Sequence, residues 1–222
     1  MLVGALILAC SEGERKPAAV PAQAEHPSGR GTVVFLGTSL TAAYQLDPGD
    51  GFPALIQARI DSAGLPFDVV NAGQSGESSE GALSRLPWLL EQPVEVLVLE
   101  TGANDMLRGT EVDSIRANLQ AMIDTVHRMQ PETDILLVGM LAAPNLGERY
   151  AGRFNAIYPE LAQRNRLVLL PFLLDGVAGD PELNLPDGIH PNPTGHRRVA
   201  ETVWAKLEPM LRARLEERAS RR

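Results

Sequence analysis

The sequence predicts an α/β domain built on a five-stranded parallel sheet. From residue 32 onward, short runs of β-branched and aliphatic residues alternate with longer amphipathic stretches, which is the pattern of βα units around a parallel sheet. The chain has 222 residues, 44% of them hydrophobic, and this is enough to bury one ordinary core without disulfides. We therefore expect a single domain over residues 31–222.

Five strands are expected, each a short apolar run that precedes a turn or a helix-like stretch. They are Thr32–Leu36, Phe67–Asn71, Val94–Glu100, Asp134–Met140 and Leu167–Leu170.

The stretches between these strands predict helices, which are Phe52–Ala63, Ser78–Glu91, Val112–Met129, Arg149–Arg164 and a last one from Pro193 onward. In the third helix, apolar residues recur every three or four positions and predict one buried face, formed by Ile115, Leu119, Met122, Ile123, Val126 and Met129. His127 lies beside that face and is expected at the surface. Pro209 is expected to end or kink the last helix, because proline removes a backbone donor.

The N-terminus predicts a targeting segment. Residues 1–10 form a short apolar run that ends at Cys10 and is too brief to span a bilayer, which needs ~20 residues. The run resembles a bacterial lipoprotein signal, which implies a periplasm-facing lipoprotein of the cell envelope, tethered to the membrane through Cys10. Residues 11–30 are polar and rich in Ala and Pro, and they predict a flexible linker. A secreted protein, cleaved near Ala22-Gln23-Ala24, and a cytoplasmic protein remain as alternatives.

Charge and cysteine content exclude several classes of protein. The net charge of −8 and the pI of about 5.1 argue against a nucleic-acid partner, which requires a clustered basic face. The single cysteine rules out an intramolecular disulfide and a cysteine-based metal site. His196 is expected to be a surface or helix residue without a metal role, since no paired histidine or cysteine supports one.

Four loops carry unusual polar residues, and each is expected beyond the carboxyl end of a strand, where open parallel sheets bind ligands. They are Gly37-Thr38-Ser39-Leu40-Thr41, Asn71-Ala72-Gly73-Gln74-Ser75-Gly76-Glu77, Glu100-Thr101-Gly102-Ala103-Asn104-Asp105 and Asp187-Gly188-Ile189-His190-Pro191.

These loops offer every group that acyl transfer requires. The reaction needs a nucleophile, a base, a group that orients the base, and donors for the oxyanion. Ser39 provides the hydroxyl, His190 accepts its proton, and Asp187 orients the imidazole from the same tight loop. The Ser39 and Gly76 backbone N–H groups and the Asn104 amide are the candidate oxyanion donors. This chemistry implies neither a metal nor an organic cofactor.

In order and spacing, the four segments resemble the sequence blocks of the SGNH/GDSL hydrolases. The stretches SGESSEGALSRLP, ETGANDMLRG and DGIHPNPTGH are most similar to the thioesterase, lysophospholipase and arylesterase branch. The resemblance implies a flavodoxin-like three-layer α/β/α sandwich and the roles given above for Ser39, Asp187, His190, Gly76 and Asn104. It also implies a serine carboxylic-ester hydrolase that acts on aryl or acyl esters, thioesters or lysophospholipids through an acyl-enzyme.

The chain departs from the family at one position, because Thr38 stands where the family name expects aspartate. That aspartate is not the triad carboxylate, so the mechanism is unaffected. The departure bears instead on the contacts that support the loop and on the catalytic rate. Thr38 is expected to hydrogen-bond locally, as turn residues do. Asp105 is expected to bond backbone amides in its own loop.

Rival interpretations remain at this point. Ser75 is a competing nucleophile within Gly73-Gln74-Ser75-Gly76, although an elbow of the form G-x-S-x-G would need glycine at Glu77. A carbohydrate deacetylase of the same family would use the same triad. A flavin-binding electron carrier would use Thr38, Ser39 and Thr41 to bind phosphate. A non-catalytic ligand-binding lipoprotein would retain only the fold.

Overall fold

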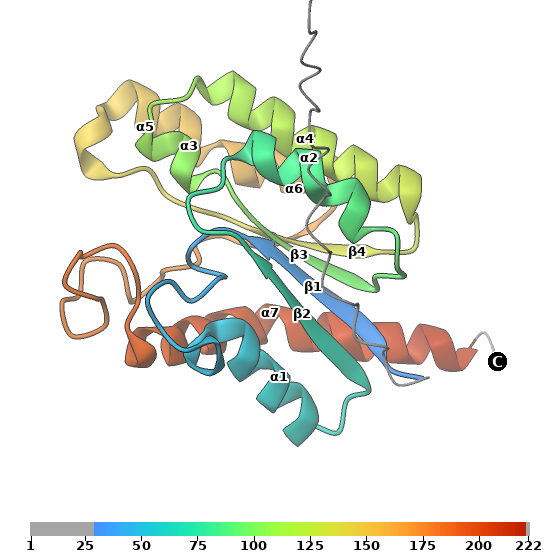
Figure 1. The fold of residues 1–222 in the computed structure, drawn as a ribbon. Helices are drawn as coiled ribbons and strands as arrows, with labels where there is room; N and C mark the ends of the chain where they lie inside the picture. Colours follow the sequence, from blue (N-terminus) through green and yellow to red (C-terminus); the bar gives the residue numbers. More distant parts are fainter. Residues whose placement is uncertain (1–28, 221–222) are drawn as a thin grey trace, which may run out of the picture.

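The protein was described by a computed structural model that covers residues 29–220 (Figure 1). All five strands pair in parallel in one sheet, in the order β2-β1-β3-β4-β5, which confirms the predicted sheet. The strands are β1 (Gly31–Gly37), β2 (Phe67–Gly73), β3 (Val96–Glu100), β4 (Asp134–Val138) and β5 (Val168–Leu170).

Helices cover both faces of the sheet. Figure 1 shows α1 and α7 on one face and α2 to α6 on the other, so the three layers are those of an α/β/α sandwich. The helices are α1 (Phe52–Ser62), α2 (Ser79–Leu89), α3 (Ala103–Leu107), α4 (Val112–Met129), α5 (Glu148–Asn155), α6 (Ile157–Asn165) and α7 (Pro193–Ser220), with short 3-10 turns η1 (Pro48–Asp50) and η2 (Pro144–Leu146). The strand order is that of flavodoxin-like sheets.

The central strands are apolar without alternation because both of their faces are covered. Val33, Leu36, Val96, Leu99 and Val138 are at most 3% exposed, although successive side chains of a strand point to opposite faces. The polar residues of the central strands therefore lie near the strand ends, as Thr32 does in β1, Glu100 in β3 and Asp134 in β4.

One predicted helix, Arg149–Arg164, is two helices in the structure. Ala156 separates α5 from α6, and Pro159 lies in the first turn of α6. A proline has no N–H to donate to the preceding turn, so it is tolerated in a first turn but interrupts a continuous helix. The short helix α3 was not predicted, because five residues after a strand carry no periodic signal.

Three single-residue expectations need correction, in whole or in part. Met129, expected in the core, is 42% exposed because α4 ends there. His196, expected to be a surface or helix residue, does lie in helix α7 but is only 1% exposed. It accepts a hydrogen bond from the Phe52 N–H, which lies 3.2 Å from its Nδ1. Pro209, expected to end or kink the last helix, does not end α7, since Leu207 and Leu211 on either side of it are buried and their packing stabilises the helix.

The carboxyl ends of the strands lie together at one edge of the sheet, on the left in Figure 1. The predicted signal segment, residues 1–10, lies outside the described residues, as does most of the predicted linker, residues 11–30. Over residues 29–220, the structure has no helix with both the length and the apolar character needed to cross a membrane.

Candidate active site

Ser39, His190 and Asp187 form one hydrogen-bonded chain at the carboxyl edge of the sheet. His190 Nε2 lies 2.9 Å from Ser39 Oγ, and His190 Nδ1 lies 2.7 Å from Asp187 Oδ2. Ser39 follows β1, whereas the other two residues come from the loop before α7. The structure thus brings together the three residues that the sequence nominated as nucleophile, base and orienting group.

The loop from Asp187 to His190 is a tight turn closed by the aspartate itself. Asp187 Oδ1 accepts hydrogen bonds from the Ile189 N–H at 2.9 Å and the His190 N–H at 3.0 Å. The bond from the His190 backbone contributes most to lowering the pKa of Asp187, which falls from 3.8 to about 2. Asp187 is therefore ionised at neutral pH, as the orienting carboxylate of an imidazole base must be.

The ends of this loop are fixed to the body of the protein. The Leu185 N–H donates to the His190 carbonyl at 2.7 Å, and residues 184 and 191 pair in an antiparallel bridge. Asn192 then caps the start of α7, since its Oδ1 accepts from the Thr194 and Gly195 N–H groups. An exposed loop consequently holds His190 in a defined place.

The turn that carries Ser39 is bound to a buried carboxylate that the sequence analysis gave no role. Glu100, at the end of β3, accepts the Thr38 N–H at 2.8 Å and the hydroxyls of Thr38 and Thr41 at 2.9 and 2.8 Å. The Thr38 hydroxyl therefore donates to a residue of the neighbouring strand β3, and not to a local partner as expected. The available signal was a carboxylate at the end of the apolar run VLVLE.

The candidate oxyanion donors belong to three loops that are tied together. The Gln74 N–H donates to the Gly37 carbonyl at 2.9 Å, and Asn104 Nδ2 donates to the Glu77 carbonyl at 3.0 Å. An amide NH2 has two hydrogens, and this bond uses one of them. Gly76 has φ of +77°, which glycine adopts without strain. The structure thus connects the loops of Ser39, Gly76 and Asn104.

Tyr44 is a contact of the base that no sequence signal indicated. Its ring centroid lies 4.5 Å from that of His190, with the planes inclined by 39°. Ala43 and Gln45, which flank it, both have positive φ, at 56° and 60°. Non-glycine residues rarely adopt this conformation, and such residues are concentrated at functional sites.

Two other sequence expectations have clear outcomes. Ser75 is exposed, and the hydrogen bond of His190 Nε2 is with Ser39, so the geometry favours Ser39 as the partner of the base. Asp105 is 2% exposed and accepts from the N–H and hydroxyl of Ser79, at 2.8 and 2.7 Å. It therefore bonds a backbone amide as expected, but that amide begins α2 and is not in its own loop.

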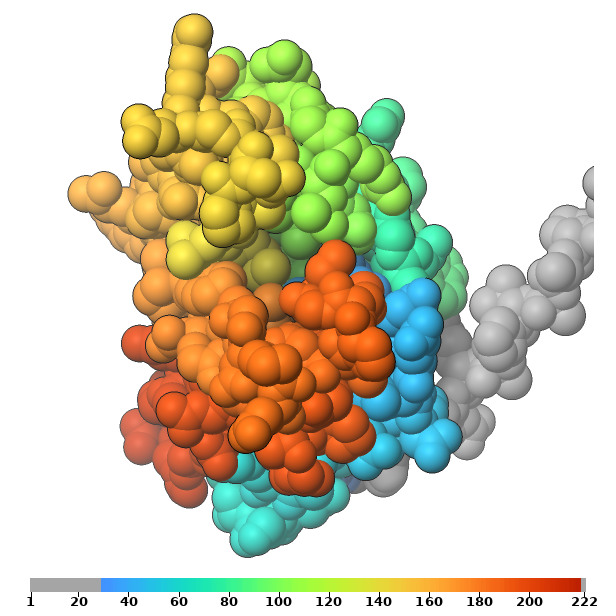
Figure 2. All heavy atoms as spheres, turned by 90° about the vertical axis from the view of Figure 1, so that its left-hand side faces the viewer, coloured from blue at the N-terminus to red at the C-terminus, as the bar shows by residue number. Residues whose placement is uncertain are grey.

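Figure 2 shows the face at which these loops end. The segment after β1, in bright blue, lies beside the orange-red segment that includes residues 185–191, below the green and yellow segments.

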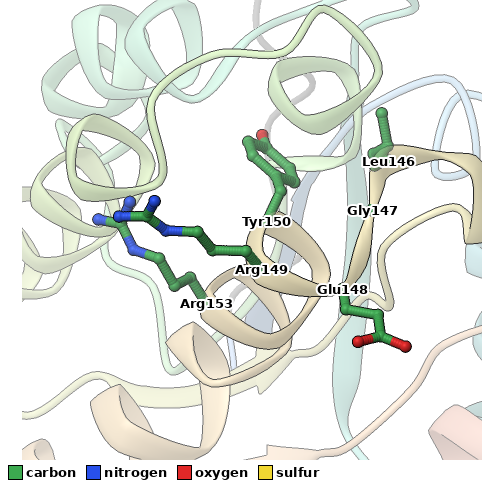
Figure 3. A pocket seen from close by; sticks show the side chains of 6 residues that line it. All are labelled: Leu146, Gly147, Glu148, Arg149, Tyr150 and Arg153. Atoms are coloured by element: carbon green, nitrogen blue, oxygen red, sulfur yellow. The ribbon is translucent and has the colours of Figure 1, made fainter.

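A separate cavity of about 360 Å³ lies beside η2 and α5, and Figure 3 shows its lining: Leu146, Gly147, Glu148, Arg149, Tyr150 and Arg153. None of the candidate catalytic or oxyanion residues lines it. Across residues 29–220, no three His, Cys, Asp or Glu residues are grouped so as to hold a metal ion.

Similarity to known proteins identifies the family of the chain. The family described as GDSL-like Lipase/Acylhydrolase matches residues 35–198. Esterase TesA of Pseudomonas aeruginosa is 38% identical over 81% of this chain and 89% of its own. Arylesterase of Vibrio mimicus is 36% identical over 79% of this chain and 87% of its own.

A third relative, Thioesterase 1/protease 1/lysophospholipase L1 of Escherichia coli (strain K12), is 37% identical over 81% of this chain and 85% of its own. A crystal structure of TesA superposes with a TM-score of 0.77, at 38% identity, and covers 81% of this chain and 99% of that one. These relationships exclude the flavin-carrier interpretation. The chain therefore belongs to the GDSL-like lipase/acylhydrolase family and is an esterase of the SGNH type.

Proposed function

We propose that the protein is a serine carboxylic-ester hydrolase in which Ser39 is the nucleophile, His190 the general base and Asp187 the group that orients it. The observation that carries this proposal is the chain of two hydrogen bonds, at 2.9 and 2.7 Å, that joins the three side chains. In a serine hydrolase this geometry activates the hydroxyl and fixes the tautomer of the imidazole.

Acylation begins with attack of Ser39 Oγ on the ester carbonyl carbon, while its proton passes to His190 Nε2. The C=O π bond breaks, and the carbonyl oxygen becomes an oxyanion. The Ser39 and Gly76 N–H groups and the Asn104 amide are the proposed donors to that oxygen. Collapse of the tetrahedral intermediate breaks the bond to the leaving alcohol or thiol, which takes the proton back from His190.

Deacylation repeats the sequence with water as the nucleophile. His190 takes a proton from water, the hydroxide adds to the acyl carbon, and the bond to Ser39 Oγ breaks. Ser39 regains its proton from His190, and the acid is released. Asp187 stays ionised throughout and stabilises the imidazolium that forms twice in the cycle.

For substrates, we propose aryl and acyl esters, thioesters and lysophospholipids. Relatives with about 37% identity carry arylesterase, thioesterase and lysophospholipase names, which supports this range. Apolar side chains exposed on the segments that follow the carboxyl ends of the strands, including the end of α3, add a physical reason, since they suit an apolar acyl or aryl group. They are Tyr44, Leu107, Leu141 and Ile189, which are 37% to 52% exposed.

Hydrolysis of p-nitrophenyl esters from acetate to octanoate tests both parts of this proposal. Wild-type protein should hydrolyse the series with kcat/KM rising with acyl length, because each CH2 buried adds about 0.8 kcal/mol. Ser39→Ala should lose the activity, whereas Ser75→Ala, the matched control, should retain it. Activity that survives Ser39→Ala, or disappears in Ser75→Ala, contradicts the site assignment.

A flat or falling series would contradict only the preference for long acyl chains. The carbohydrate deacetylase alternative is tested by adding acetylated sugars to the set of substrates, since the enzyme would then hydrolyse them faster than any longer acyl ester.

We further propose that Cys10 carries a lipid that tethers the protein to the bacterial cell envelope. The support is the apolar run that ends at Cys10 and the polar linker behind it. Mass spectrometry of the mature N-terminus should find an acylated Cys10. An unmodified Cys10, or a retained Met1, contradicts the tether.

A further inference from the structure

Glu100 is an ionisable side chain buried at a position where a charged carboxylate is energetically unfavourable. It is 1% exposed and ends β3, a central strand whose other residues are apolar. Burial raises its pKa from 4.5 to about 7, although hydrogen bonds from Thr38 and Thr41 act in the opposite direction. Buried polar groups need hydrogen-bond partners, so the identity of its partners indicates what Glu100 does.

All of these partners lie on the turn that carries Ser39. Glu100 Oε2 accepts the Thr38 N–H and the Thr41 hydroxyl, both at 2.8 Å, and Oε1 accepts the Thr38 hydroxyl at 2.9 Å. Thr38 precedes Ser39, and Thr41 follows it by two residues. No ion pair of residues 29–220 includes Glu100, so these donors are what compensate its burial.

The turn and the carboxyl group fit together closely. A side chain at Gly37 would bring its Cβ within 2.0 Å of Thr41 Oγ1 and 2.6 Å of Glu100 Oε2. Gly73 packs against the same turn, since a Cβ there would lie 2.4 Å from the Ala42 backbone nitrogen. The position of the turn is therefore fixed both by Glu100 and by the end of β2.

We propose that Glu100 is a positioning residue for the nucleophile, acting through Thr38 and Thr41 to hold the Ser39 hydroxyl and N–H where acyl transfer needs them. The proposal rests on the proposed function of Ser39. No hydrogen bond joins Glu100 to His190 or Asn104 in the described part of the chain, so its effect passes through the turn alone. Misplacement of a reacting group by about 1 Å costs up to 10²-fold in rate.

The same arrangement explains why threonine serves at the position where the family name has aspartate. The Thr38 hydroxyl has a proton to donate to Glu100, whereas an ionised carboxylate accepts only. Thr38, which replaces the aspartate of Gly-Asp-Ser-Leu, thus links the turn of Ser39 to Glu100 on the neighbouring strand through its hydroxyl.

The test compares Thr38→Val, which removes the hydroxyl at nearly constant volume, with Thr38→Ser, which keeps it. Thr133→Val is the matched control, because Thr133 is also buried and donates its hydroxyl to the Val94 carbonyl at 2.6 Å, before β4 at the opposite edge of the sheet. The readouts are kcat and KM for p-nitrophenyl butyrate, the rate at which a fluorophosphonate labels Ser39, and the thermal midpoint.

Thr38→Val should lower kcat and the labelling rate about 10- to 100-fold with KM within about twofold, and Thr38→Ser should restore both. Thr133→Val should lower the thermal midpoint without changing either rate. Equal rates in Thr38→Val and wild type would overturn the positioning role, as would losses in Thr133→Val equal to those in Thr38→Val.

A second variant covers the case in which Thr38→Val does not fold. Glu100→Gln keeps the shape of the side chain but leaves one acceptor oxygen in place of two, so it should also lower kcat and the labelling rate at unchanged KM. Wild-type rates in a folded Glu100→Gln protein would contradict the proposal. Failure of the wild type itself to label at Ser39 would instead remove the proposed function, and the positioning role with it.

Discussion

Replacing Glu100 by glutamine should change how the stability of the protein depends on pH. The folded protein holds this carboxyl with its pKa raised to about 7, because burial disfavours the charged form. In the unfolded chain the group titrates near its ordinary value of 4.5. Between these two values the folded state keeps a proton that the unfolded state has released, so wild-type stability falls as the pH rises.

The size of the effect follows from the two pKa values. The difference between 4.5 and about 7 corresponds to roughly 3 kcal/mol, all of it lost between about pH 4.5 and about pH 7. Glutamine does not titrate, so the free energy of unfolding of Glu100→Gln minus that of wild type should increase by this amount over the same range. The offset between the two proteins at low pH reports the change in hydrogen bonding and is independent of the slope.

Urea unfolding at half-unit steps from pH 4.5 to pH 8, followed by circular dichroism, measures this difference. Other titrating groups are common to both proteins and cancel, among them His196. Thr133→Val is the control, since it changes stability without changing a titratable group and its offset should not vary with pH. If the difference in the free energy of unfolding between Glu100→Gln and wild type stayed constant over this range within about 0.5 kcal/mol, the argument that burial raises the pKa of this carboxyl would be refuted.

Three further predictions concern the base, the oxyanion site and the core. Asp187→Asn should lower kcat by about 10⁴-fold while the fold persists, because the amide does not hold the required imidazole tautomer; unchanged kcat would contradict the role of Asp187. Asn104→Ala should lower kcat by about 10²- to 10³-fold with little change in KM, and a change confined to KM would place Asn104 in binding alone. His196→Gln should remove roughly 3 kcal/mol of acid destabilisation between about pH 6.5 and about pH 4, since burial lowers the pKa of His196 to about 4 and the folded state resists the proton that the unfolded state takes up. If the free energy of unfolding of the wild type, plotted against pH, ran parallel to that of His196→Gln, the prediction for His196 would be contradicted.

The sheet could be predicted from the sequence because each strand is an apolar run with helical stretches on either side. β1 and β4 begin within one residue of the expected positions, and α4 has the expected bounds. What failed depends on tertiary packing: His196 is buried because α1 offers it the Phe52 N–H, and α7 continues through Pro209 because its flanking leucines are packed. Neither condition can be read from local sequence.

The residues of the candidate site could be predicted from the sequence, but the contacts that hold them in place could not. Ser39, Asp187 and His190 stand in short segments whose order identified them, and the loop positions follow from a parallel sheet. Glu100 could not be given a role, because its partners lie 59 and 62 residues away in the chain and only the pairing of β1 with β3 brings them together. The same is true of Tyr44, whose contact with His190 depends on a strained turn.

The most direct test of the account is mass spectrometry of the protein after exposure to a fluorophosphonate. The account predicts one adduct, on the peptide that contains Ser39, absent in Ser39→Ala and strongly reduced in His190→Ala but present in Ser75→Ala. Such a result would establish an activated serine served by His190. An adduct on Ser75, or no adduct on a folded and ester-hydrolysing wild type, would contradict the assignment of Ser39 as the nucleophile.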